Sequence, residues 1–406
     1  MSSGNAVKVT SYAQMKQLLS WEGGFITNAK FSIDKLYSSW RRNGARAALG
    51  MIQADRGISV TPDTLEHPIS QFKLIRRFVK DWPKVDKLLA DEGQSVKGLK
   101  SVVEQLKQYK SYEIAIDGIL RIQGTYNYAA QEIQRGLPHH TRFTVMPHLD
   151  ARECYDIGRH AYIQEGTPPR LVNDWMRVAR SLIDDDTEVQ LKIDILDHLG
   201  FTASKIGDSQ TPIDTYQHLQ QLRPDEDRFA QNVDYYTRKI REAKYQKGES
   251  NWEGTVFDPL NTNSHQNPSY RAETAEYERL CRSELVYQPE ILNQLTCFYW
   301  NGYNNPYLLF QPYKAEMLHS EPMILRFYDV LSDFEIDTLI SLGEPQLKWA
   351  TVQDPATGQL VNAAYRISES AWLRADSHAV VSNYRKRISM ITGLTMERAE
   401  DVQLGM

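Results

Sequence analysis

Hydrophobic positions in the first third of the chain recur at intervals of three, four and seven residues. One such stripe runs from Ala29 to Met51 and a second from Phe72 to Leu89, the spacing of a single buried helix face. Because threes and fours alternate as in a coiled-coil seam, we expect these helices to pair, within the chain or between two copies. Pro83 interrupts the second stripe and predicts a kink or a new helix start. A third long helix is predicted between Lys97 and Gln134.

Helical periodicity resumes at about Asp150 and continues to Lys244, after a turn-rich stretch that begins at Gly136. Small residues at Gly200 and Ala203 would let two antiparallel helices approach closely, and Pro224 would end the second one. These positions fall near the intervals of a tetratricopeptide repeat, although Ala203 stands where that repeat usually has an aromatic residue. The pattern predicts helix-turn-helix pairs of the tetratricopeptide type.

After Ser320 the pattern changes to alternating, β-rich segments. Ser332 precedes a short apolar helix with Glu three residues later, which is a capping-box signature. The stretch from Trp349 to Ser368 predicts a hairpin around an Asp-Pro-Ala-Thr-Gly turn, and a helix is predicted from about Val380 to Thr392. A further strand is predicted to begin near Val402.

Composition and charge narrow the class of protein. The chain has 406 residues, and its 47 basic and 52 acidic side chains leave a net charge of −5, which gives no general attraction for nucleic acid. No apolar run reaches the ~20 residues of a membrane span, and the amino terminus lacks the apolar core of a secretory signal. Of three cysteines, Cys281 and Cys297 are close enough for a small disulfide loop with Cys154 as a buried thiol, but three reduced cysteines are equally compatible.

Two features are candidates for a functional site. His148-Leu-Asp150 has the His-x-Asp form of a non-haem iron site, yet Asp150 is also well placed to cap the helix that follows, and this second interpretation is favoured. Aromatic side chains between residues 150 and 244 could line a surface for an extended proline-rich peptide, whose polyproline II form exposes free carbonyls. Buried core packing is the competing interpretation of these aromatics.

Motifs in order along the second half of the chain resemble the alpha subunit of collagen prolyl 4-hydroxylase. They are Tyr277-Glu-Arg-Leu-Cys-Arg, Cys297-Phe-Tyr, the run that begins at Ile324-Leu-Arg-Phe-Tyr-Asp, Ala350-Thr-Val-Gln-Asp-Pro-Ala-Thr-Gly and Tyr365-Arg-Ile-Ser-Glu-Ser-Ala-Trp-Leu. The His67-Pro and Phe72-Lys-Leu segments are similar to the family's dimerisation domain. The resemblance therefore extends over almost the whole chain.

The resemblance implies a mainly α fold with four parts. These are a helical, coiled-coil dimerisation domain (8–135), a tetratricopeptide-like, all-α peptide-substrate-binding domain (143–244), a linker with a Cys281–Cys297 loop (245–320), and the start of an incomplete α+β double-stranded β-helix oxygenase domain (321–406). The same resemblance implies that Cys281 and Cys297 form a disulfide.

Peptide-binding positions are also implied by the resemblance. They are Tyr162, Asp197, His198, Phe201, Arg228 and Tyr235, with His198 and Phe201 where the family usually has tyrosine. Relatives of this kind use Fe(II), 2-oxoglutarate and ascorbate to hydroxylate X-Pro-Gly prolines of procollagen. They pair with protein disulfide isomerase as the beta subunit and with a second alpha subunit, in the lumen of the endoplasmic reticulum.

The family's iron ligands and 2-oxoglutarate lysine follow a strand that resembles the one near Val402, and this sequence ends at Met406. We therefore expect no catalytic or metal-binding residue in this chain, no bound cofactor, and no hydroxylase activity of the chain alone. The alternative is a non-catalytic protein that binds proline-rich peptides or supports assembly. A third interpretation, a cytosolic helical scaffold, predicts free thiols at Cys281 and Cys297.

Overall fold

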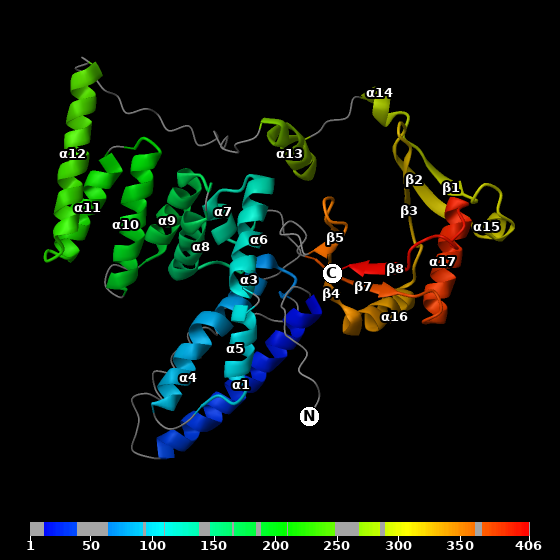
Figure 1. Cartoon of the computed structure of the whole chain (residues 1–406), viewed down its shortest axis with the longest axis horizontal. Coiled ribbons are helices and arrows are strands. Elements are labelled where there is room, and N and C mark those ends of the chain that lie inside the picture. Colours follow the sequence, from blue (N-terminus) through cyan, green and yellow to red (C-terminus); the bar gives the residue numbers. More distant parts are fainter. Residues whose placement is uncertain are drawn as a thin grey trace. The chain divides into compact units, whose positions relative to one another are not determined.

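The chain divides into two compact units that part between Glu284 and Leu285. The computed structural model describes residues 12–38, 64–91, 95–108, 110–137, 147–164, 166–183, 188–208, 210–247, 268–284, 289–361 and 368–405. Helices build the first unit, and the second adds short antiparallel strands to its helices (Figure 1). The mainly helical fold with a small strand-containing carboxyl region is therefore confirmed, while the finer domain boundaries stay predictions.

Helices of moderate length form the amino-terminal part of the first unit. They are α1 (Tyr12–Ser38), α3 (Pro68–Arg76), the π-helical turn η2 (Arg77–Asp81), α4 (Trp82–Ala90), α5 (Leu99–Gln108), α6 (Ser111–Tyr126) and α7 (Ala130–Gln134). Phe72, Ile75, Trp82 and Leu89 of the second predicted stripe are all buried, because this face packs inward. Pro83 is the second residue of α4 and follows the π-helical turn η2, so the irregularity predicted there is present, but as a π-helical turn within backbone that stays helical from Pro68 to Ala90.

The predicted long helix between Lys97 and Gln134 is wrong in its continuity. Lys110 and Asn127 adopt left-handed backbone conformations, with φ of 50° and 55°, and each separates two helices. Hydrophobic periodicity persists across both breaks, so the stripe alone does not reveal them. Of the first predicted stripe, α1 accounts for the part up to Ser38, and residues 39–63 lie outside the described residues.

Five helices follow one another in an array, each packed on the next (Figure 1). They are α8 (Ala151–Ile163), α9 (Pro169–Leu182), α10 (Val189–Lys205), α11 (Gln210–Leu222) and α12 (Asp227–Lys247). Asp150 begins this array, because its carboxylate accepts from the Glu153 amide at 2.7 Å while Glu153 accepts from the Asp150 amide at 2.9 Å. The capping interpretation of the His148-Leu-Asp150 motif is thereby confirmed.

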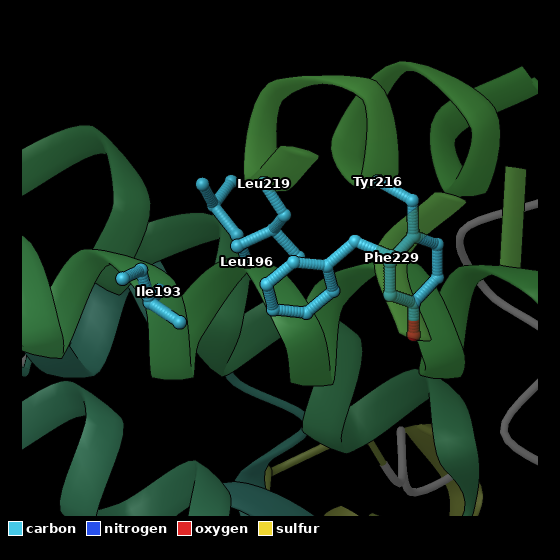
Figure 2. Packing of buried hydrophobic residues seen from close by; sticks show 5 residues of the cluster. All are labelled: Ile193, Leu196, Tyr216, Leu219 and Phe229. Carbon is cyan, nitrogen blue, oxygen red and sulfur yellow. The ribbon is translucent and has the colours of Figure 1, made fainter. Parts of the chain in front are cut away.

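Close helix approach in this array depends on glycine. A Cβ added at Gly200 of α10 would lie 3.0 Å from the ring of Tyr216 on α11, and one at Gly158 of α8 would lie 2.9 Å from Trp175 Cβ on α9. The predicted role of Gly200 in letting two helices approach is confirmed. Figure 2 shows the cluster that this packing buries, in which side chains of three helices converge. Its members are Ile193, Leu196, Tyr216, Leu219 and Phe229.

The last helix of the first unit is α13 (Pro268–Cys281), and the Arg282 guanidinium after it donates to the Thr125 carbonyl at 2.9 Å. The second unit then contains, in chain order, α14 (Pro289–Leu292), β1 (Cys297–Trp300), α15 (Pro306–Phe310), β2 (Tyr313–His319), β3 (Ile324–Phe327), α16 (Asp333–Gly343), η3 (Glu344–Gln346), β4 (Lys348–Trp349), β5 (Val352–Gln353), β6 (Leu360–Val361), β7 (Glu369–Leu373), α17 (Ala379–Thr392) and β8 (Val402–Gly405). The strands pair antiparallel as β1-β2-β3, β4-β7-β8 and β5-β6.

Local predictions in the second unit are confirmed. Ser332 Oγ accepts from the Glu335 amide, and Glu335 accepts in return from the Ser332 amide at 2.9 Å, so α16 starts with the predicted capping box. Gln353 pairs with Leu360 across the predicted Asp-Pro-Ala-Thr-Gly turn, Trp349 pairs with Glu369, and residues 362–367 of the predicted hairpin lie outside the described residues. Val402 pairs with Leu373 in the predicted last strand. No described helix has both the length and the apolar composition of a membrane span.

Candidate functional site

Helices α8 and α10 bring three of the six predicted binding residues together. The Tyr162 ring of α8 lies 5.0 Å from the ring of His198 and 5.8 Å from that of Phe201, both on α10, with edge-to-face geometry. Tyr162 remains 43% exposed and Phe201 37%. These three residues, the aromatic cluster, keep part of their ring surface open to solvent, and the Lys205 ammonium lies over the Phe201 ring at 5.2 Å.

Hydrogen bonding fixes the orientation and the tautomer of His198. Its Nδ1 lies 2.7 Å from the Asp194 carbonyl oxygen, which accepts only, so Nδ1 carries the proton. The rings of Tyr155 and Tyr162 contact the imidazole at 5.7 and 5.0 Å with nearly perpendicular planes. His198 is therefore held as a flat, oriented surface.

A charged pair lies next to this cluster and joins α10 to α12. Arg228 Nη1 donates to Asp197 Oδ2 at 2.8 Å, and the Tyr216 hydroxyl donates to Asp197 Oδ1 at 3.1 Å. Burial is the largest single influence on the pKa of Arg228 and lowers it, but the hydrogen bonds and charges of Asp197 and Glu226 together outweigh burial, so the pKa is raised. The Arg228 guanidinium also donates to Glu226 and remains half-exposed, which leaves N–H groups for a ligand.

Tyr235, the sixth predicted residue, lies on α12 with more than half of its surface exposed. Its ring contacts Tyr236 edge-on at 5.1 Å, and Tyr236 stacks on the buried Tyr216 at 5.8 Å with nearly parallel planes. A continuous set of aromatic contacts therefore connects exposed Tyr235 to Tyr216, the residue that orients Asp197.

An open pocket of about 440 Å³ adjoins the aromatic cluster, at the amino-terminal ends of α8 and α10. It contains none of the six predicted residues, but Tyr155 belongs to both regions, since its ring also contacts His198. The lining residues are Arg152, Tyr155, Asp156, Glu188, Val189, Gln190, Leu191 and Asp194.

Tyr155 and Tyr216 are functional candidates that the sequence interpretation missed. Tyr155 precedes Tyr162 by seven residues, two turns of α8, so helical spacing would have placed both on one face. Tyr216 gives no such signal, because its contact with Asp197 arises only when α11 packs on α10. Burial, with Asp197 beside it, raises the pKa of Tyr216 far above its ordinary value, so the hydroxyl stays protonated and donates.

Neither the cysteines nor the acidic residues form a further site in the part of the chain that the structure describes. Cys154, Cys281 and Cys297 are free thiols there, and no three His, Cys, Asp or Glu side chains come together as metal ligands. Cys281 and Cys297 fall in different units, so their predicted disulfide stays a prediction.

Paired helices packed in sequence define the class of fold: a tetratricopeptide-type helical protein. Family comparison agrees with this class. Residues 151–242 match the prolyl 4-hydroxylase peptide-substrate-binding domain, and residues 11–140 match the amino-terminal region of the prolyl 4-hydroxylase alpha subunit.

Curated relatives extend the similarity to nearly the whole chain. Prolyl 4-hydroxylase subunit alpha-2 of Gallus gallus is 30% identical over 403 residues, which cover 97% of this chain and 74% of the relative. Subunit alpha-1 of Homo sapiens is 30% identical with the same coverage, and subunit alpha-1 of Caenorhabditis elegans is 29% identical over 84% of this chain and 60% of the relative. The chain belongs to the family of prolyl 4-hydroxylase alpha subunits.

Proposed function

We propose that this chain binds proline-rich, procollagen-like peptides in polyproline II conformation and presents them for 4-hydroxylation of X-Pro-Gly prolines. The observation that supports this most is the aromatic cluster of Tyr162, His198 and Phe201 beside the Asp197–Arg228 pair. Ring faces pack well on pyrrolidine rings, and a polyproline II segment is extended before it binds, so little conformational entropy is lost.

Each polar group then has a part in binding. The peptide carbonyls of a polyproline II segment have no internal partners, and the free N–H groups of Arg228 are donors of the right kind for them. Asp197 holds the guanidinium in place at 2.8 Å, and Tyr216 holds Asp197 at 3.1 Å. Recognition in this proposal combines apolar stacking with directed hydrogen bonds, the usual division of work in peptide binding.

Family membership also motivates proposals about the assembled enzyme. We propose Fe(II), 2-oxoglutarate and ascorbate as its cofactors, protein disulfide isomerase and a second alpha subunit as its partners, and the endoplasmic reticulum lumen as its compartment. The metal-ligating side chains of the described residues do not come together in a set of three, so no catalytic step is assigned to them. The proposed contribution of the described site is to hold the peptide.

The test is calorimetry of the full chain with (Pro-Pro-Gly)5 and with a control peptide of the same length in which alanine replaces proline. Binding of the first peptide alone is expected. Tyr162→Ala should weaken it on the order of tenfold, as for a central aromatic contact. Tyr126→Ala is the matched control, because Tyr126 also lies in the last turn of a helix, α6, with 41% exposure against 43% for Tyr162, and this variant should bind normally. Absence of binding by the folded chain, or equal loss in both variants, would contradict the proposal.

A further inference from the structure

The pocket at the amino-terminal ends of α8 and α10 contains a buried polar group without a partner. Tyr155 lines the pocket with 9% of its surface exposed, and its hydroxyl makes no hydrogen bond within the described part of the chain. Polar groups of buried residues nearly always have a partner, so a hydroxyl that makes no bond within the protein and lines an open cavity is available to a ligand group. Burial, followed by the nearby Asp194 carboxylate, raises the pKa of Tyr155 to about 12, so the phenol is neutral at physiological pH.

Charge balance in the pocket shows which ligand group fits. Arg152 is paired with Glu188 at 2.8 Å, and Asp156 is paired with Arg76 at 3.1 Å. Asp194 differs, because its carboxylate accepts only from the Gln190 amide at 2.9 Å and has no ion-pair partner among the described residues. Among the charged residues that line the pocket, one carboxylate is left over, which favours a cationic group, while Arg159 acts on Tyr155 from outside the lining.

We propose that this pocket is a second subsite of the peptide-binding surface, which takes the side chain of a lysine or arginine that flanks the proline-rich segment. Asp194 supplies the opposite charge, and Tyr155 Oη accepts a hydrogen bond from the ammonium or guanidinium group. The inference rests on the proposed function and adds to it a class of substrate: proline-rich peptides with a basic residue beside the proline block.

The geometry makes the subsite continuous with the aromatic cluster. Tyr155 contacts His198 at 5.7 Å and also lines the pocket, and Asp194 precedes His198 by four residues, one turn of α10. One helical turn rises about 5.4 Å and a polyproline II residue about 3.1 Å, so the basic residue lies about two or three positions from the stacked proline.

Peptides of matched length test this subsite in the full chain by calorimetry. One set carries lysine two or three residues beyond either end of (Pro-Pro-Gly)5, and the matched set carries norleucine there. We expect the peptide whose lysine lies at the end nearer the pocket to bind about three- to tenfold more tightly than its norleucine counterpart, and salt should reduce this preference. Asp194→Asn should abolish the preference, and Tyr155→Phe should reduce it while preserving the ring contact with His198.

Asp214→Asn is the control for charge and helix structure. Asp214 accepts from the Gln210 amide at 2.7 Å on α11, which copies the Gln190–Asp194 arrangement outside the pocket, so this variant should keep the lysine preference. Equal affinity for lysine and norleucine peptides, or a preference that survives in Asp194→Asn, overturns the subsite. Failure of the folded chain to bind (Pro-Pro-Gly)5 itself overturns the proposed function instead.

Discussion

At the scale of single residues, the site depends on side chains that orient other side chains. Two donors, Tyr216 and Arg228, hold the Asp197 carboxylate, whose side chain is 28% exposed. Tyr216 is buried between Phe229 and Tyr236, so the donor is rigid, and its hydroxyl lies at the edge of the cluster in Figure 2. Preorganisation of this kind lowers the entropy that binding must overcome.

Removal of the Tyr216 hydroxyl should therefore weaken peptide binding although Tyr216 is buried. Tyr216→Phe keeps the ring stack and deletes one hydrogen bond, so we expect a loss of about 0.5–1.5 kcal/mol in stability and a fewfold weaker affinity for (Pro-Pro-Gly)5. Urea unfolding and calorimetry measure the two quantities. Tyr236→Phe is the control, because its hydroxyl donates to Ser204 at 3.3 Å and not to Asp197, so its affinity should stay normal. Unchanged affinity in Tyr216→Phe would contradict the role assigned to this hydroxyl.

Sequence reasoning proposed the exposed residues of the candidate site but not the residues that support them. Resemblance to a family pointed to Tyr162, Phe201 and Arg228, which the structure places on helices of one array. The contact of Tyr216 with Asp197 joins residues 19 positions apart on different helices, and no local pattern encodes it. The same holds for the missing partner of Tyr155, because satisfaction of a buried hydroxyl is visible only once neighbours are packed.

At the scale of elements, helix ends were predictable where their signals are local. The Ser332–Glu335 capping box and the Asp150 cap are encoded within four residues, and both start helices as predicted. The breaks at Lys110 and Asn127 were missed because neither is a glycine or proline, although asparagine is enriched in left-handed backbone and so gives a weak local signal. Short-range chemistry fixes where these helices begin, whereas tertiary context decides where the 97–134 stripe divides.

The hydrogen bonds of Glu335 on α16 predict that the stability of the second unit depends on pH in the acidic range. Its carboxylate accepts from Ser332 and from both terminal nitrogens of Arg387 on α17, at 3.0 and 2.8 Å, and chiefly the Arg387 bond lowers its pKa from 4.5 to about 2. A carboxyl group whose pKa is lowered in the folded state stabilises the fold when it is ionised. This stabilisation is complete above pH 4.5 and is lost as the pH falls through 2. Glu335→Gln should cost about 1–2 kcal/mol at pH 7, and the gap to the wild type should shrink below pH 4.5.

Hydrogen exchange of the α16 amides at several pH values measures the difference in stability between Glu335→Gln and the wild type for the second unit alone. Asp337→Asn serves as the control, because Asp337 is exposed on the same helix, and its effect should stay within about 0.5 kcal/mol at every pH. A gap between Glu335→Gln and the wild type that does not depend on pH would refute the assignment.

At the scale of the whole molecule, periodicity predicted which segments are helical but not how the amino-terminal helices join the peptide-binding array. The structure places α3 against α8 through buried charges within the first unit. Lys73 Nζ donates to Glu153 Oε2 at 2.7 Å, and Arg76 Nε donates to Asp156 Oδ2 at 3.1 Å. The two basic residues are three positions apart on α3, and the two acidic residues are three positions apart on α8. Charged residues at these positions would be assigned to the solvent face of a helix from the sequence alone, so this junction was not predicted.

The Lys73–Glu153 pair is the more buried of the two, with 8% and 5% of the side chains exposed, and its removal should destabilise the whole first unit. Lys73→Met leaves Glu153 buried without a counter-charge, which costs about 3–5 kcal/mol. Burial already raises the pKa of Glu153, and Lys73 opposes that rise, so loss of the lysine raises the pKa further. A carboxyl group with a raised pKa is tolerated better when protonated, and the cost in Lys73→Met should therefore be largest near pH 8 and shrink towards pH 5.

Urea unfolding across this pH range measures the cost, and two further variants separate the buried charge from other effects. Adding Glu153→Gln to Lys73→Met should recover much of the stability at pH 8, since no ionised group is then left buried. Lys84→Met removes a lysine that is 51% exposed and 3.3 Å from Asp81, and it should change the free energy of unfolding by less than about 0.5 kcal/mol. If Lys73→Met costs no more than Lys84→Met, or the same at pH 5 and pH 8, α3 and α8 are not held together by this charge pair, and apolar packing alone joins the amino-terminal helices to the peptide-binding array.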